Sequence, residues 1–312
     1  MKKSFLLMLV SAILYAFFTP LTKLLLGELP STFLGGLTYL GSALGMTIVF
    51  IIARLTKIDK DELLNKKDFM YVAFVNVLDV CSSLCLFYGI SLISSEEASL
   101  LQSFEVVSTA LVAFLVFKEK ISWRLLVAII FLLCGSIFLA FDFNTQITFN
   151  LGAFFVLLAV TLFGISNNVI KKVANKDSLE FSIFKSLVPG LVLIIIALCT
   201  KEYNFNWPYI SYSLVVGFLT FGVSVFFYAI AVRKLSASLG TTVFSSNPFF
   251  AAIISLLIFK DIPKWNFYVS LILLIIGEIF AAYDNYMNDK KEQIVKQNVE
   301  NGLEDKKNKN KA

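Results

Sequence analysis

Residues 95–142 of this chain read SEEASLLQSFEVVSTALVAFLVFKEKISWRLLVAIIFLLCGSIFLAFD, and a related copy follows later in the sequence. Residues 237–284 read ASLGTTVFSSNPFFAAIISLLIFKDIPKWNFYVSLILLIIGEIFAAYD. The charged link Phe117-Lys118-Glu119 falls on Phe259-Lys260-Asp261, and the same register aligns Trp123 with Trp265, Gly135 with Gly277 and Asp142 with Asp284. Both copies are apolar enough to lie in lipid. The chain therefore contains two copies of one membrane unit, an arrangement that favours a binding site between the copies.

The repeat extends over both halves of the chain. The alignment places Thr19-Pro20 on Asn167-Asn168, Lys23 on Lys171, and Phe87-Tyr88 on Phe227-Tyr228. We therefore predict two five-span units, residues 1–142 and 150–284. Because five is an odd number, the second unit enters the membrane from the opposite side, which makes the units inverted repeats. Lys23 is then expected near the outer surface and Lys171 near the inner one.

Composition indicates an all-α membrane protein. The chain has 312 residues, of which 58% are hydrophobic and 16% charged, and its mean hydropathy is +0.80. Its apolar stretches are about 20 residues long, the length a helix needs to cross a bilayer, and they lack the alternation of barrel strands. The ten predicted transmembrane helices cover residues 4–27, 32–54, 69–93, 96–117, 122–141, 150–171, 179–200, 208–232, 236–259 and 264–284.

The distribution of cations predicts the orientation. All but four of the 27 Lys and Arg residues lie at the N-terminus, in alternate links or in the C-terminal tail. The exceptions are Lys201, Lys260 and Lys264 in the opposite links, and Lys23 within the first span. By the positive-inside rule, both termini face the cytoplasm. The segment that begins Lys2-Lys3 has no small-residue cleavage site, so we interpret it as a retained first helix. Residues 285–312 are predicted to form a disordered cytoplasmic tail.

Several classes of function are excluded or disfavoured by composition. The chain has no His, which removes most zinc and haem sites, and its four Cys lie inside predicted spans, where packing is their expected role. It has no Walker motif. We therefore expect no cofactor, no metal and no ATP-driven chemistry on this chain, and we interpret the net charge of +5 as a topology signal rather than as evidence for nucleic acid.

The chain resembles the EamA-type members of the drug/metabolite transporter superfamily. The motif of that family appears as Ala98-Ser99-Leu100-Leu101, then Glu105-Val106 and Phe117-Lys118-Glu119, and again as Asn247-Pro248 and Phe259-Lys260-Asp261. Two departures are Val106 in place of the usual proline, and Asn247 where the first copy has Glu105. The resemblance implies ten helices with span 4 beside a central cavity. It also implies that span 10, with Glu278, serves packing or a homodimer contact.

Charged and polar side chains inside the spans are the candidate site residues, because each charge in lipid costs about 2.5–3.5 kcal/mol. Glu105 shares a helix face with Gln102 and Thr109, and Asp79 shares a stripe with Asn76 and Ser83. For both acids, helix packing is the alternative to lining a cavity. Asn167 and Asn168 can hydrogen-bond a substrate, whereas Lys23 and Lys171 are expected to snorkel to the interface.

The second copy adds polar residues beside a proline. Ser245, Ser246 and Asn247 precede Pro248, which frees a backbone carbonyl one turn earlier. These side chains suit either a binding site at a broken helix or a kink capped by its neighbours. Tyr15, Tyr88 and Tyr228 can line an aromatic cavity, although most of the 32 Phe residues are expected to face lipid.

The leading functional hypothesis is a secondary transporter of small organic metabolites. The direction of transport cannot be read from the residues, and the family resemblance implies an exporter of amino acids or related compounds. Such a transporter would alternate access around a midplane cavity, with Glu105 and Asp79 either coupling transport to protons or pairing with a cationic substrate group. The alternatives are a non-transporting membrane scaffold and an intramembrane enzyme, for which no catalytic motif is present. Lys-rich composition and short links favour a bacterial inner membrane as the location, and a eukaryotic organelle membrane is the alternative.

Overall fold

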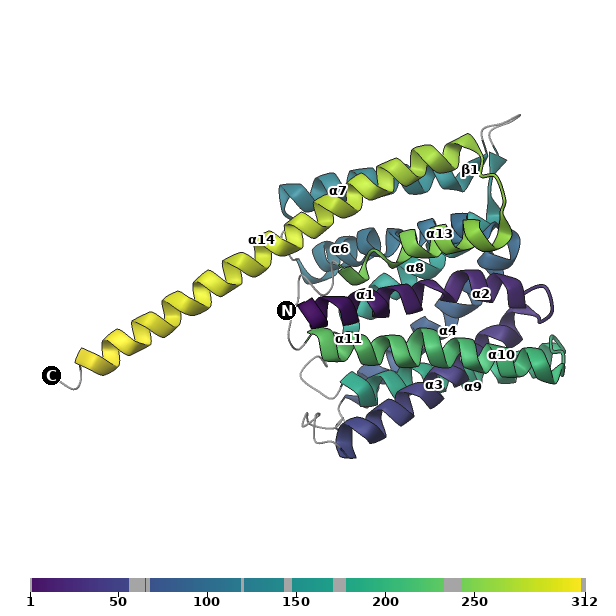
Figure 1. Cartoon of the computed structure of the whole chain (residues 1–312), viewed down its shortest axis with the longest axis horizontal. Coiled ribbons are helices and arrows are strands. Elements are labelled where there is room, and N and C mark those ends of the chain that lie inside the picture. The colour runs from purple at the N-terminus through teal and green to yellow at the C-terminus, as the bar shows by residue number, and fades with distance from the viewer. Residues whose placement is uncertain are drawn as a thin grey trace.

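The computed structural model describes residues 2–55, 65, 68–118, 121–142, 148–170, 178–232 and 243–309. These residues form a helical bundle with one two-residue antiparallel ladder, in which β1 (Phe141–Asp142) pairs with β2 (Thr148–Phe149). The helices lie roughly side by side, and α1 begins at the end of the bundle from which α14 projects (Figure 1). We call this the terminal end and the opposite one the far end.

The helices follow the predicted spans closely. Nine segments of the described residues are long and apolar enough to cross a membrane, and α13 is a shorter apolar helix. The bounds are α1 (Lys2–Ala16), α2 (Phe18–Leu25), α3 (Ser31–Leu55), α4 (Phe69–Leu92), α5 (Ser95–Leu101), α6 (Phe104–Phe117), α7 (Trp123–Ala140), α8 (Leu151–Ile170), α9 (Ser178–Thr200), α10 (Trp207–Gly217), η2 (Phe218–Val223), α11 (Ser224–Val232), α13 (Asn247–Phe259) and α14 (Trp265–Lys309). The predicted span 236–259 is described only from residue 243 onward.

Four of the predicted spans are not continuous α-helices. The first divides into α1 and α2 at Phe17, and the fourth divides into α5 and α6 at Gln102 and Ser103. The eighth contains the π-helical turn η2 between α10 and α11, and turn residues Ser245 and Ser246 precede α13. Only the break near Pro248 was predicted. The sequence around Gln102 lacks a proline, and its break was missed. Irregular backbone inside a membrane is tolerated where it is buried in protein or lines a cavity.

Helices of the two halves pack against each other in antiparallel pairs. In the pair α7 and α14, Asn266 Nδ2 donates a hydrogen bond of 3.1 Å to Phe138 O near the far end. The Arg124 guanidinium lies 5.2 Å from the Tyr283 ring near the terminal end. In the pair α3 and α9, the hydroxyls of Ser42 and Ser186 are 2.9 Å apart. These pairs join segments that lie far apart in the sequence.

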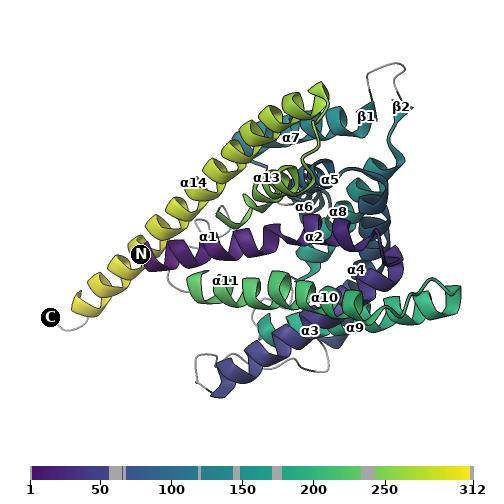
Figure 2. The same cartoon turned by 45° about the vertical axis from the view of Figure 1, so that its right-hand side comes forward.

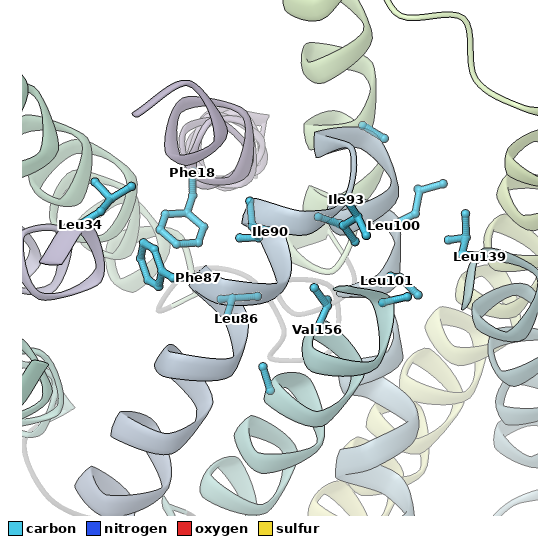
Figure 3. Close-up of a cluster of buried hydrophobic side chains, with 14 of the residues drawn as sticks. Phe18, Leu34, Leu86, Phe87, Ile90, Ile93, Leu100, Leu101, Leu139 and Val156 are labelled. Carbon is cyan, nitrogen blue, oxygen red and sulfur yellow. The ribbon is translucent and has the colours of Figure 1, made fainter. Parts of the chain in front are cut away.

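The far half of the bundle is filled by apolar side chains. Figure 3 shows part of this core, contributed by α2, α3, α4, α5, α7 and α8 and the residue after α4. Phe87 and Ile90 come from the last turns of α4, Leu139 from the end of α7, and Val156 from the beginning of α8. All four are at most 2% exposed. The ends of these helices that lie farthest from the termini therefore enclose a dry core.

The outer surface is apolar, as expected for a bundle in lipid. Large side chains such as Leu115 (71% exposed), Leu257 (70%) and Ile279 (62%) point away from the bundle. Exposed apolar area of this extent is unusual for a water-soluble monomer. With the nine long apolar helices, it identifies an integral membrane protein.

The structure corrects the prediction of a disordered tail after residue 284. Instead, α14 continues as a helix to Lys309 and extends beyond the bundle (Figures 1 and 2). Residues 285–309 are rich in Lys, Glu, Gln and Asn and contain no Pro. Lys, Glu and Gln are good helix formers, so a helix that has started in the membrane can propagate through them.

Candidate functional site

A polar cavity of about 550 Å³ opens between the two halves of the chain. Six of the predicted site residues line it: Tyr15, Gln102, Glu105, Asn167, Ser245 and Asn247. Thr109, on the predicted stripe with Gln102 and Glu105, also lines the cavity. Other lining residues are Ile121, between α6 and α7, and Asn288, on the projecting part of α14. The cavity therefore extends from the breaks in the helices toward the terminal end, and we call it the terminal cavity.

Glu105 is held in place by a hydrogen bond across the cavity wall. It lies in the first turn of α6, where the partial positive charge of the helix N-terminus favours a negative group. Asn167 on α8 donates from Nδ2 to Glu105 Oε1 at 2.6 Å. The break before α6 brings Glu105 to the cavity surface, and α8 supplies its fixed donor.

Gln102 joins the break in the fourth span to the first span. Its Nε2 donates to Thr19 Oγ1 at 2.8 Å and to Ala98 O at 3.2 Å. The second bond ties the side chain to its own helix just where α5 ends. Gln102 thus connects three segments around the cavity: α2, α5 and the start of α6.

The wall formed by α14 carries two more acids that sequence reasoning did not assign to the site. Asp284 accepts a hydrogen bond from the Ser122 hydroxyl and a second, of 3.1 Å, from Asn288 Nδ2. Glu278 also lines the cavity, and its Oε1 is buried without a hydrogen-bond partner among the described residues. The resemblance had suggested packing or dimer contact for Glu278. The position of this acid within a largely apolar predicted span was the sequence signal that could have assigned it to the site.

Aromatic rings close the cavity toward the far half. The Tyr15 ring lies 5.2 Å from Phe221 and 5.2 Å from Phe244, both in edge-on arrangements. Phe18 continues the cluster, 5.0 Å from Phe221 and 5.8 Å from Phe87 of the dry core. Phe221 belongs to η2, and π-turns of this kind recur at functional sites. The cluster separates the terminal cavity from the far end.

Asp79 lies outside the cavity and forms an ion pair with a partly exposed lysine. The Asp79 side chain is fully buried, and Lys185 Nζ of α9 is 3.8 Å from its Oδ2. Ser166 on α8 donates to Asp79 Oδ1 at 3.0 Å. The polar stripe on α4 therefore faces α8 and α9 rather than the cavity. Ser83 of the stripe donates to the Asp79 carbonyl within its own helix.

The other predicted residues also lie elsewhere. Asn168 donates to Thr109 O and Gly164 O, both at 2.9 Å, and joins α8 to α6. Asn76 lines an apolar groove of about 540 Å³ beside α4 and α9. Tyr88 lines a separate far-end pocket of about 520 Å³ with Thr32 and Glu202. Tyr228 packs on Phe244 at 5.1 Å, one ring away from the cavity.

Lys23 forms hydrogen bonds with the end of α4, whereas the sequence predicted only that its side chain would reach the membrane interface. Its Nζ donates to Ile90 O at 2.8 Å and to Ser91 O at 3.1 Å, at the end of α4. A cation there satisfies carbonyl groups that a helix C-terminus leaves free. Lys171, its predicted counterpart, lies outside the described residues.

Side-chain chemistry limits what the cavity can do. The described residues contain no group of three or more His, Cys, Asp or Glu side chains placed to hold a metal ion. The cavity instead offers carboxylates, amides, hydroxyls and aromatic rings. Such a lining can bind a small polar molecule and exchange protons with it.

Comparison with known proteins identifies the same two units. The family model described as the EamA-like transporter family matches residues 2–141 and again residues 150–283. A transporter of Methanothermobacter thermautotrophicus, described as uncharacterized, is 24% identical over 294 residues, covering 89% of this chain and 85% of its own length. A second, of Clostridium kluyveri and described in the same words, is also 24% identical, over 267 residues, covering 79% of this chain and 84% of its own length.

A solved crystal structure supports the fold. It aligns with a TM-score of 0.62 at 13% sequence identity, covering 89% of this chain and 95% of the other. At this identity the likeness concerns the fold alone.

Proposed function

Because this chain belongs to the EamA-like transporter family, we propose that it moves small organic metabolites, such as amino acids or related compounds, by alternating access. It is a membrane transporter of the drug/metabolite type. The observation that carries the finer proposal is the terminal cavity, where polar residues of both halves converge beside broken helices. A binding site at discontinuous helices between repeats is typical of transporters that work by alternating access.

Reciprocal contacts support the inverted repeat on which this mechanism depends. Gly135 faces Leu274, and their counterparts in the repeat, Gly277 and Leu132, face each other in turn. Likewise, Gly36 of α3 faces Ile194 of α9, and Gly190 of α9 faces Leu40 of α3. Two antiparallel helices related by a two-fold axis between them must contact each other in this reciprocal way.

The wider packing supports the same symmetry. In the predicted repeat, α4 corresponds to α11, and α8 corresponds to α1. The helices α4 and α8 are in contact, and so are their counterparts α11 and α1. We infer that ten spans form two inverted units, with α13 as part of the ninth. Rocking of one unit against the other would close the terminal cavity and open the far half.

Sidedness and direction form part of the proposal. The positive-inside rule assigns the terminal end to the cytoplasm, so that the cavity would face the cytoplasm in this conformation. Loading from the cytoplasm and release at the far end would make the protein an exporter in a bacterial inner membrane. Glu105 would bind and release the coupling proton from its position in the cavity wall.

Flux measurements test the proposal directly. Metabolite profiles of cells with and without the chain select candidate substrates, and proteoliposomes containing only this protein then measure their flux. The scaffold alternative predicts no flux for any candidate. A pH gradient should drive flux through the wild-type protein if protons are coupled to transport.

Substitution of Glu105 tests its role in that flux. Glu105→Gln removes the titratable group, retains a planar polar side chain, and should abolish gradient-driven flux while the protein remains folded. Glu28→Gln, at an exposed acid in the turn after α2, is the matched control and should leave flux unchanged. Full activity of the Glu105→Gln protein would remove Glu105 from the site.

A further inference from the structure

We propose that the terminal cavity takes small organic amines in their cationic form, anchored by Glu278 and Glu105. This inference rests on the proposed transport function and narrows its substrate class. It favours amines over amino acids and over anionic metabolites as substrates. The family relationship does not decide among these classes.

The charge of the lining favours a cation. Three carboxyl groups line the cavity, those of Glu105, Glu278 and Asp284, whereas no Lys or Arg is present among the described lining residues. A substrate anion would therefore find no cationic partner among the described lining residues and would lie near carboxyl groups. A zwitterionic amino acid could place its ammonium group here, but among the described lining residues its carboxylate would meet neutral donors such as Gln102 and Asn247.

The three acids differ in the hydrogen bonds that their carboxyl oxygens accept. Asp284 already accepts from Ser122 and Asn288, and Glu105 accepts from Asn167 at 2.6 Å. Glu278 Oε1 is buried and has no partner among the described residues. Buried polar atoms in proteins are almost always hydrogen-bonded. An ammonium group carries up to three N–H donors and no acceptor, which suits this oxygen.

The wall opposite α14 suits the rest of an amine. Tyr15 and Phe244 line the cavity in edge-on contact, and Tyr228 supports Phe244 from behind. Aromatic rings bind apolar bodies and attract cations through their faces. The cavity volume of about 550 Å³ lies within the range of small-molecule sites, roughly 300–1,000 Å³. An aromatic or aliphatic amine of modest size fits both the aromatic wall and the volume of the cavity.

A charge-graded series with one common body tests the proposal. The probes are tyramine as the cation, tyrosine as the zwitterion, tyrosol as the neutral alcohol and 4-hydroxyphenylpropionate as the anion. Binding to the purified full-length protein is measured by thermal stabilisation, and flux is measured in proteoliposomes. We expect tyramine to bind about tenfold or more tightly than each of the other three.

Variants then locate the anchor. Glu278→Gln should weaken tyramine binding by about tenfold and leave the weak binding of tyrosol unchanged, whereas Glu28→Gln should alter neither. If the Glu278→Gln protein does not fold, the wild-type series alone decides. Equal or tighter binding of tyrosine, of tyrosol or of the anion overturns the inference, as does a lack of tyramine binding or unchanged tyramine binding in folded Glu278→Gln protein.

The two readouts separate this inference from the proposed function. Selective tyramine binding without flux of any probe would support the amine site and contradict transport. Flux of the anion or of the zwitterion without preference for tyramine would support transport and contradict the amine site.

Discussion

At the scale of single residues, three consecutive side chains of α8 donate hydrogen bonds to three different parts of the bundle. Ser166 donates to Asp79, Asn167 to Glu105, and Asn168 to the carbonyl of Thr109. Successive residues of a helix point about 100° apart, so one short segment serves three neighbours. Of the two membrane acids predicted as candidates, Glu105 therefore lines the cavity, whereas Asp79 joins α4 to α8 and α9.

The ion pair of Asp79 and Lys185 should act as a structural unit. Asp79→Asn leaves Lys185 without its carboxylate. We expect a loss of roughly 2 kcal/mol in unfolding free energy, less than the 3–5 kcal/mol of fully buried pairs, because the Lys185 side chain is 27% exposed. The double variant Asp79→Asn/Lys185→Met should recover part of that loss. Unfolding titrations in detergent measure both, and strictly additive losses would mean that the pair is not coupled.

At the scale of elements, close helix approach depends on glycine. A methyl group at Gly41 of α3 would collide with the Leu214 carbonyl of α10, and one at Gly217 would collide with the Thr38 carbonyl of α3. Gly45 lies against Gly222 of η2 in the same seam. Residues 41–45 form a GxxxG pattern, which favours close helix contact, but the pattern does not identify the partner helix.

Alanine substitution tests this seam. Gly217→Ala should destabilise the protein by about 3 kcal/mol or more, above the usual range for overpacking, because the colliding atom is a backbone oxygen that cannot rotate away. The control is Gly27→Ala, where the nearest atom to an added methyl group is 3.4 Å away. Melting temperatures in detergent compare the two. Equal stability of the two variants would show that α3 and α10 can move apart at little cost.

At the scale of the whole molecule, the terminal cavity opens toward the terminal end, whereas an apolar core and a separate pocket of about 520 Å³ lie toward the far end. The aromatic cluster of Tyr15, Phe18 and Phe221 separates the two regions. Under the proposed alternating-access mechanism, this conformation would be the state whose binding cavity opens toward the terminal end. The proposed two-fold symmetry would give a second state in which the two ends exchange these roles.

Cysteine accessibility measures this asymmetry. In a variant whose four native cysteines are replaced, Thr109→Cys in the cavity should react with a membrane-impermeant maleimide added on the terminal side. Ser99→Cys, at a fully buried position of α5, should react at least about tenfold more slowly from either side. Rapid labelling of Ser99→Cys from the far side would contradict a closed far half. The side that labels Thr109→Cys also reports which end faces the cytoplasm.

The sequence by itself determined the features that depend on local composition and on self-similarity. Span length and apolarity follow from the thickness of the bilayer. They predicted ten membrane-crossing helices, and the described residues contain nine long apolar helices and the shorter α13. The internal repeat and the motif around Glu105 predicted the family that the comparison shows. Polarity inside a span also selected Glu105, Asn167 and Gln102, which the structure brings together in one cavity.

Only the tertiary structure decided which polar groups meet. Asp79 and Glu105 are both acids within apolar helices, and nothing in their local sequence separates the residue that pairs with Lys185 from the one that faces the cavity. Glu278 lies 173 positions after Glu105 in the sequence, yet both line the same space. Contacts between distant segments depend on the rotation and depth of every helix in the packed bundle, and local sequence patterns do not encode these quantities.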